Sequence, residues 1–229
     1  LHALALSLKA SGDHRGGRVD GTVQLDDTTL QLQPLRARLS DDLATLQLEQ
    51  LALASPQIAG QLQASGLVQL ATTPLTADLA VQWKGVALPQ ELVGQPLLTA
   101  GSLSAKGSTE HFQAHGDVSI GPPGEPAHLA VDLAGTPASI ALRTLTLKQP
   151  KGQLVASGTV DLQPTLGWQL DVQAKAFDPG ELLAGWPGAI DAELHTRGHR
   201  QEAGWEASLA LPRLTGRLRQ RALRGKGDL

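Results

Sequence analysis

The stretch GQLVASGTVDL, residues 152–162, decides how this chain folds, and the chain contains it twice. Residues 60–70 read GQLQASGLVQL and are identical to it at eight of eleven positions. The similarity extends forward, so that one copy spans residues 60–107 and the other spans 152–198, at a separation of 90 to 92 residues. A decayed third copy begins at about residue 216. Repetition at a fixed period is typical of stacked, extended architectures.

Apolar and polar side chains alternate within residues 152–162. The even positions are apolar or glycine, and the odd positions are mostly polar. This period of two predicts a strand with one dry and one wet face. The same alternation recurs along most of the chain, and the connections are rich in Gly, Pro, Asp and Ser. The sequence therefore predicts an all-β fold of a dozen or more successive, mostly antiparallel strands.

Glycine interrupts the apolar side of the repeated strand at the same place in each copy, Gly66 and Gly158. Glycine inside a strand commonly marks a bend or a close backbone approach. A sheet bent along one line becomes an elongated, curved, U-shaped half-pipe with an aliphatic groove. One short capped helical turn is expected after residue 177, with Asp178 as the N-cap and Glu181 completing a capping box. A weaker version is expected over residues 88–94.

Composition favours such a groove over a compact core. The 229 residues are 41% hydrophobic but only 3% aromatic, with four Trp, two Phe and no Tyr. Compact domains of this size usually anchor their cores with more rings. We therefore expect residues 1–229 to form one continuous sheet. Because Met is absent and strand-like alternation is present at both ends, we also expect the chain to be a piece of a longer protein. No apolar run approaches the roughly 18 residues that span a bilayer.

Charge is mildly negative overall, at −3, but uneven. From Arg197 onward the chain carries eight basic and three acidic residues. Arg217, Arg219 and Arg221 are expected to share one face of a strand, opposite Leu218. The favoured reading is a solvated face or a charge-protected edge, and the alternative is contact with an anionic headgroup or a nucleic acid. No aromatic residues interleave with these arginines, which argues against a nucleic-acid partner.

The sequence shows no convincing catalytic constellation. The absence of Cys excludes disulfides and thiol nucleophiles. His111 and His115, like His195 and His199, lie four residues apart, but in strand patterns that spacing separates them by about 13 Å. The acidic doublets 26–27 and 41–42 are expected to be turn residues. The sequence therefore predicts a protein that is not an enzyme, with no catalytic residues, no cofactor and no metal site.

Three features together resemble one protein family. They are the strand at 152–162, the Phe-Asp-Pro turn at 177–179 followed by Gly-Trp-Pro-Gly at 185–188, and the closing segment 214–229. They are similar to TamB proteins, of the AsmA-like, bridge-like lipid transfer superfamily. The resemblance covers nearly the whole chain and is strongest from about residue 140. It implies a β-taco fold and a periplasmic location, as part of an inner-membrane-anchored protein of a diderm bacterium.

The resemblance also implies partners and a role in outer-membrane biogenesis. The implied partners are phospholipid acyl chains and an outer-membrane TamA-like protein. Family members have been linked to the assembly of outer-membrane proteins and to phospholipid transport. The residues expected to line the lipid groove are Leu62, Ala64, Val68, Leu70, Leu79, Val81 and Trp83 in the first copy, and Leu154, Ala156, Val160, Leu162, Leu170 and Val172 in the second. Leu182, Leu183 and Trp186 are a candidate cover for that groove.

Three functional hypotheses follow. The first is a non-enzymatic conduit that carries phospholipid acyl chains along the groove between inner and outer membranes. The second is a scaffold or chaperone that works with TamA and pairs its sheet edges with nascent outer-membrane proteins, autotransporters among them. The third is an extracellular β-helix adhesin, disfavoured because the chain has no Asn for stacked ladders and its repeat is too long.

Overall fold

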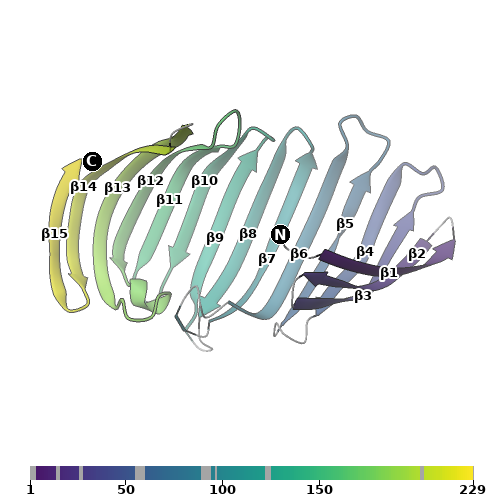
Figure 1. Ribbon diagram of the computed structural model, residues 1–229, viewed down its shortest axis with the longest axis horizontal. Helices are drawn as coiled ribbons and strands as arrows, with labels where there is room; N and C mark the ends of the chain where they lie inside the picture. Colours follow the sequence, from purple (N-terminus) through teal and green to yellow (C-terminus); the bar gives the residue numbers. More distant parts are fainter. Residues whose placement is uncertain are drawn as a thin grey trace. The chain divides into compact units, whose positions relative to one another are not determined.

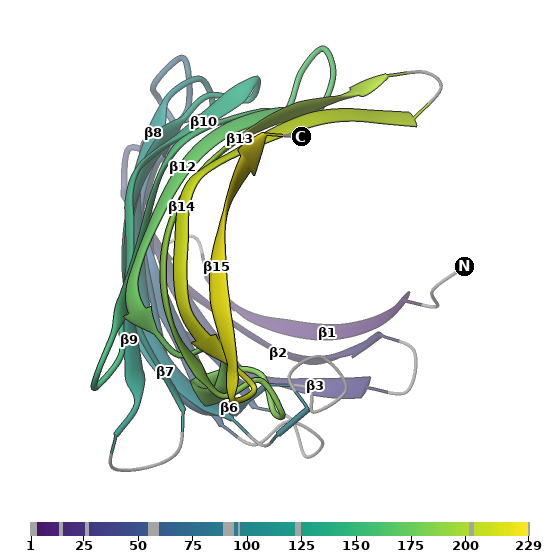
Figure 2. The same cartoon turned by 90° about the vertical axis from the view of Figure 1, so that its left-hand side faces the viewer.

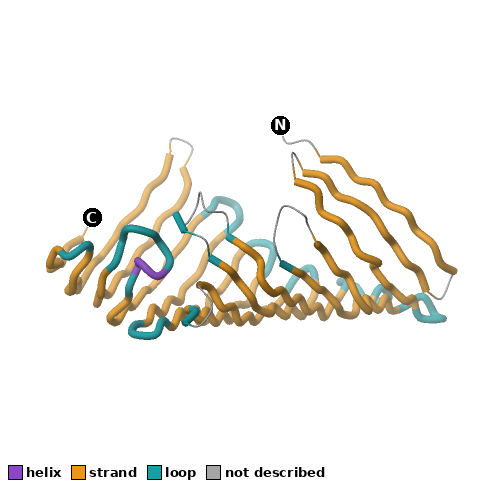
Figure 3. The backbone as a smooth tube through the Cα atoms, turned by 90° about the horizontal axis from the view of Figure 1, so that it is seen from below, coloured by secondary structure: helices purple, strands orange, loops and turns teal. Residues whose placement is uncertain are grey.

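The computed structural model describes residues 4–13, 16–25, 28–54, 60–88, 94–95, 97–121, 125–201 and 204–228, and these are almost entirely strand (Figure 1). The strands are β1 (Leu4–Asp13), β2 (Gly16–Leu25), β3 (Thr28–Leu39), β4 (Thr45–Ala54), β5 (Gln61–Gln69), β6 (Thr76–Ala87), β7 (Leu98–Ser108), β8 (Phe112–Gly121), β9 (Ala127–Gly135), β10 (Ser139–Lys148), β11 (Gln153–Asp161), β12 (Gly167–Phe177), β13 (Gly188–Gln201), β14 (Gly204–Leu218) and β15 (Arg221–Asp228). A 3₁₀ turn, η1 (Pro179–Glu181), is the purple segment of Figure 3. The all-β prediction is confirmed.

The chain forms two units. The first contains residues 1–87 and 99–110, and the second contains residues 88–98 and 111–229. Within each unit the strands are neighbours in chain order and form an open sheet, from β1 towards β7 in the first and from β8 to β15 in the second. The described pairings are antiparallel, for example β5 with β6 and β11 with β12. Short hairpin connections suffice for such an arrangement. The expectation of one continuous segment over residues 1–229 stays a prediction.

The two sequence copies correspond to the same run of elements. Residues 60–107 contain β5, β6 and nearly all of β7, and residues 152–198 contain β11, β12, η1 and most of β13. The repeated sequence thus encodes two adjacent antiparallel strands joined by a loop, residues 70–75 or 162–166, followed by a longer connection and a third strand. In both copies the first strand also pairs with the strand before it, β4 or β10.

Strands of the second unit bend in a common direction along their length, which gives that unit a U-shaped cross-section (Figure 2). The repeated glycines lie where a side chain would collide with the backbone of the neighbouring strand. A Cβ on Gly158, whose φ is +144°, would lie 2.0 Å from the carbonyl oxygen of Gln169 on β12. A Cβ on Gly66 would lie 2.3 Å from the carbonyl oxygen of Asp78 on β6. Only glycine permits this approach.

The turn after β12 is held from outside its own segment. Asp178 is its N-cap, and its Oδ1 accepts hydrogen bonds from the backbone N–H groups of Gly180 and Gly188, both at 2.8 Å. Gln149 braces the same residue, because its Oε1 accepts from the Asp178 N–H at 2.8 Å and its Nε2 donates to the Asp178 carbonyl at 2.7 Å. The predicted cap is confirmed, but the predicted capping box is wrong. The Asp178 N–H donates to the side chain of Gln149 and not to that of Glu181.

A second segment reaches the same turn. Gln95 donates from Nε2 to the carbonyl oxygen of Glu181 at 3.2 Å. Gly94 also lies against Ala184, whose Cβ is 3.3 Å from the position of an added Cβ on that glycine. Most of the weaker helical turn predicted over residues 88–94 lies outside the described residues. Residues 94–95, in the connection that precedes β7, therefore contact residues 181–184, in the equivalent connection that precedes β13. Both segments belong to the second unit.

Few side chains are fully enclosed. Among the described residues, no large side chain is less than 2% exposed, and the buried apolar side chains are Leu97, Ala114, Ala127, Leu147 and Ala156. The accessible surface is 15051 Å². A compact monomer of the same mass exposes about 9,900 Å². The described strands therefore leave much apolar surface uncovered by a second layer.

Candidate functional site

The strand register places most apolar residues of β5 and β6 on one face. Directly opposite residues of antiparallel strands point to the same side of a sheet. Leu62 lies opposite Trp83, and Ala64 lies opposite Val81. On the other side of β5, Leu53 and Leu51 of β4 lie opposite the same two β5 residues. Along β5 these apolar positions are half-buried and alternate with exposed ones. We call this side the apolar face and the opposite side the polar face.

The other residues predicted for the first copy fall into two groups. Val68 and Leu79 lie on the apolar face, opposite Ala77 and Gly66. Leu70 instead follows the end of β5, where its backbone N–H donates to the Ala44 carbonyl and its side chain is exposed. The structure thus brings six of the seven predicted residues onto one face and leaves Leu70 at its margin.

The second unit repeats this arrangement on β11 and β12. Ala156 lies opposite Val172, and Leu154 lies opposite Ala174. Val160 faces Trp168 on one side and Ile140 on the other. Leu170 of β12 lies opposite Gly158. Leu162 follows the end of β11, donates its backbone N–H to the Ala138 carbonyl and is exposed, as Leu70 is in the first unit.

The same apolar face continues across all eight strands of the second unit. Its members on β8 to β10 are Phe112, Ala114, Val118, Ile120, Leu133, Val131, Leu129, Ala127, Ile140, Leu142, Leu145 and Leu147. Its members beyond β12 are Leu194, Ala192, Ile190, Ala207, Leu209, Leu214, Leu218 and Leu223. The register also places Arg200 of β13 and Arg221 of β15 on this side, opposite Trp205 and Leu218, near the two ends of the face. Between these ends, hydrocarbon is presented from strand to strand.

The indole groups of Trp83 and Trp168, on the apolar faces of the two units, have hydrogen-bond partners. The indole N–H of Trp168 donates to Thr196 Oγ1 at 3.2 Å, and that hydroxyl lies 3.3 Å from the Ser208 carbonyl, to which it donates. The first unit has the same device, in which Trp83 donates to Thr99 Oγ1 at 3.1 Å and Thr99 donates to a backbone carbonyl. Satisfied polar groups add no fixed anchor for a polar ligand. The hydroxyls of Thr99 and Thr196 were not predicted, because alternation alone does not mark a threonine as an indole acceptor.

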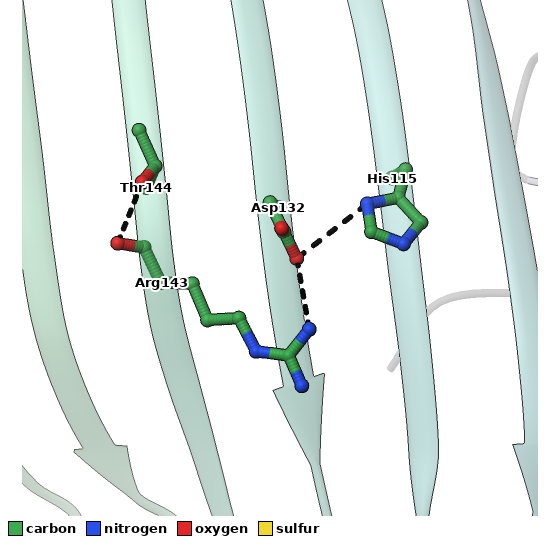
Figure 4. A network of polar contacts seen from close by, with 4 residues as sticks. All are labelled: His115, Asp132, Arg143 and Thr144. Atoms are coloured by element: carbon green, nitrogen blue, oxygen red, sulfur yellow. Dashed lines mark hydrogen bonds and ion pairs between the residues drawn. The ribbon is translucent and has the colours of Figure 1, made fainter.

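The polar face carries ion pairs between neighbouring strands (Figure 4). Asp132 on β9 lies between His115 on β8 and Arg143 on β10, with both nitrogen–oxygen distances at 3.5 Å. In the first unit this face has a hollow of about 900 Å³ beside the Lys106–Asp78 ion pair. Exposed pairs of this kind contribute little stability. These ion pairs form part of a solvated surface, and none of the three is arranged as a catalytic site.

Histidine on the polar face is tuned by its neighbours. Asp171 Oδ1 lies 2.5 Å from His195 Nδ1, and Glu193 lies 3.5 Å from Nε2. The hydrogen bond to Asp171, helped by the charge of Glu193, raises the pKa of His195. Across the described part of the chain, no group of three or more His, Asp or Glu side chains is placed to hold a metal ion.

The acidic doublets behave as turn residues where they can be seen. Asp42 accepts hydrogen bonds from Ser40 Oγ at 2.5 Å and from the Ala44 N–H at 3.0 Å, and these bonds lower its pKa. The doublet at 26–27 lies outside the described residues.

The predicted arginine stripe is wrong. Arg217 is on the polar face of β14, but the strand ends at Leu218 and a two-residue turn follows. Arg219 stands in that turn, and Arg221 begins β15 directly opposite Leu218, on the apolar face. Arg219 lies over the Trp186 ring, with its guanidinium carbon 5.3 Å from the ring centroid.

The candidate cover lies next to this turn. Leu182 is half-buried at the end of η1, whereas Leu183 and Trp186 are 44% and 46% exposed. Their part in covering a groove stays a prediction.

Together, the open antiparallel sheets and their apolar faces define a class of protein that works through a long surface. Residues 17–229 match the family described as TamB, N-terminal domain, and the chain belongs to that family. TamB-family proteins act broadly in outer-membrane assembly and lipid transport, are generally non-enzymatic, work with TamA and are periplasmic, membrane-anchored proteins of diderm bacteria. No curated protein and no solved structure matches the chain. Within the described residues, the structure contains no helix with the length and hydrophobicity of a membrane span.

Proposed function

We propose that the apolar face of each unit is the inner, lipid-bearing surface on which phospholipid acyl chains lie as they pass between the inner and outer membranes. The observation that carries this proposal is the register. It places apolar side chains opposite one another on every neighbouring pair from β8 to β14. Between β14 and β15 it places leucines opposite glycines, as at Leu214 and Gly225. Gly158 supports the proposal, because an added Cβ there would meet the backbone of β12, and glycine within a strand commonly marks a bend.

The energetics suit a conduit. Each methylene removed from water contributes about 0.8 kcal/mol, so an acyl chain lying on aliphatic side chains recovers much of the cost of leaving a bilayer. The indole and hydroxyl groups on the face are paired with each other and with backbone carbonyls, as at Trp168 and Thr196. A surface without free polar anchors lets a chain slide, because no position holds it by directed bonds.

Site-specific crosslinking tests the proposal. Photoreactive residues at 170 and 172 on β12 should yield lipid adducts in cells, and those at 169 and 173 should not. The first two positions are half-buried on the apolar face, and the second two are exposed on the polar face. Equal lipid labelling from both faces would contradict the assignment.

A matched pair of substitutions tests lipid binding itself. Val160→Asp places a carboxylate on the apolar face between Ile140 and Trp168, and Thr159→Asp places the same group on the polar face of the same strand. We expect the first variant to lose labelled phospholipid while keeping its β-sheet circular dichroism, and the second to bind as the unmodified protein does. Delipidated protein that takes up neither fatty acid nor phospholipid would end the conduit hypothesis.

A further inference from the structure

One end of the second unit's apolar face carries charge. Gly188 of β13, Leu218 of β14 and Arg221 of β15 lie directly opposite one another in a single cross-strand row. Neighbouring strands are about 4.8 Å apart, so the row spans about 10 Å. The side chain of Leu218 leans over Gly188, where an added Cβ would come 3.2 Å from its Cδ1. Arg221 is therefore a cation at this end of the apolar face, as Arg200, opposite Trp205, is at the other end.

Two more groups are fixed at the same end. The backbone N–H of Arg219 donates to the Pro187 carbonyl at 2.8 Å, which ties the β14–β15 turn to the loop before β13. Arg219 then lies over the ring of Trp186, which is 46% exposed. Tryptophan favours the boundary between hydrocarbon and water, because its ring is apolar and its N–H is polar.

These arginines have no acidic partner among the described residues. No described ion pair joins a carboxylate to Arg219 or Arg221. The carboxylate of Asp178, which is bonded to the Gly188 N–H, is occupied by two backbone donors. Guanidinium groups bind phosphate through paired, charge-assisted hydrogen bonds. A cation over the Trp186 ring and a second cation on the adjoining end of the aliphatic face match a phosphate that is attached to an acyl chain.

The turn itself is conformationally costly. Arg219 and Gln220 both have positive φ, at 50° and 65°. A two-residue hairpin loop with this geometry strongly prefers Asn-Gly. Left-handed conformations of other residues persist where the surroundings enforce them, and they cluster at ligand sites. Arg219 is therefore a less favourable turn residue than asparagine would be, but it places a cation over the Trp186 ring.

We propose that Trp186, Arg219 and Arg221 form a headgroup site that holds the phosphate of a phospholipid whose acyl chain lies on the apolar face of the second unit. The inference rests on the proposed lipid-bearing role of that face. It adds a fixed binding position at one end of a surface that otherwise permits sliding.

The test compares ligands with and without phosphate on the delipidated chain. Dihexanoyl phosphatidylglycerol, dihexanoyl glycerol and inorganic phosphate are titrated by calorimetry. The double variant Arg219→Gln/Arg221→Gln should bind phosphatidylglycerol at least tenfold more weakly and should bind the glyceride unchanged. The control Arg224→Gln removes an arginine from the polar face of the same strand, opposite Thr215, and should change neither affinity.

A second variant separates binding from folding. Arg219→Asn/Gln220→Gly gives the turn its preferred residues, so it should raise the melting temperature while weakening phosphatidylglycerol binding. Unchanged binding in either variant would overturn the headgroup site and leave the conduit intact. Inorganic phosphate that binds as tightly as phosphatidylglycerol would also overturn it, because the site would then recognise a free anion. Failure of both lipids to bind the unmodified chain would instead remove the conduit hypothesis.

Discussion

Replacement of Gly158 by alanine should destabilise the second unit far more than an ordinary glycine substitution. The new Cβ would lie 2.0 Å from the Gln169 carbonyl oxygen and 2.9 Å from the Leu170 Cα, both of which are backbone atoms of β12. Backbone cannot rotate away, so the two strands must separate. Overpacking of this kind costs about 1–3 kcal/mol. The φ of +144° adds a further cost of about 1–3 kcal/mol for a residue with a side chain.

The sum, about 4 kcal/mol, is a large part of the roughly 5–15 kcal/mol that stabilises a domain. With a urea m-value of about 2–3 kcal/mol per molar, the midpoint should fall by about 1.3–2 M. Tryptophan fluorescence can follow it in a Trp83→Phe background, because Trp168, Trp186 and Trp205 then all report on the second unit.

Gly225→Ala is the matched control. It lies on the same apolar face, and its added Cβ would meet only Leu214 Cδ2, at 3.9 Å. That variant should stay within about 1 kcal/mol of the unmodified protein. Equal midpoints for the two glycine variants would refute the argument that Gly158 sets a close approach of β11 and β12.

Two further predictions concern the turn after β12 and the polar face. Gln149→Ala should lower the free energy of unfolding by about 2 kcal/mol, since it removes both hydrogen bonds to the Asp178 backbone. It should also speed amide hydrogen exchange at residues 178–183. Unaltered exchange there would show that Gln149 does not hold the turn. Because its folded pKa is raised, His195 should stabilise the protein below the ordinary pKa of 6.5 and lose that effect as the pH rises through the raised value. The melting temperature of His195→Gln should therefore fall below that of the unmodified protein at about pH 5.5 and approach it at about pH 9, and a pH-independent difference would contradict the role of the Asp171 bond.

The alternation of apolar and polar residues predicted the strands and the face that each side chain occupies. It could do so because successive side chains along a strand point to opposite faces of the sheet. It holds for Leu154, Ala156 and Val160, which stay in one register with β12. The alternation fails at bulges, where one strand gains a residue that the sequence does not mark. Such shifts occur between Leu142 and Leu145.

The arginine-rich segment, residues 217–223, contains a chain reversal that the alternation of residue types does not reveal. The alternating letters of RLRQRAL, residues 217–223, read as one strand, yet the chain reverses at Arg219 and Gln220. Neither residue is a usual signal for a hairpin turn, so the reversal was missed and Arg221 was given the wrong face. The brace from Gln149 was also beyond sequence reasoning, because 29 residues separate it from Asp178.

Within each unit, hydrogen-bonded strands follow one another in chain order, and this has a consequence for how the protein is made. Pairing between strands that are adjacent in sequence closes only short loops. Each hairpin therefore loses little conformational entropy before its hydrogen bonds and side-chain contacts form. A chain threaded progressively across a membrane can therefore add one hairpin at a time to an existing edge, without waiting for a distant partner strand. Lengthening the protein requires only more hairpins of the same kind, as in other arrays whose stability is the sum of nearest-neighbour terms.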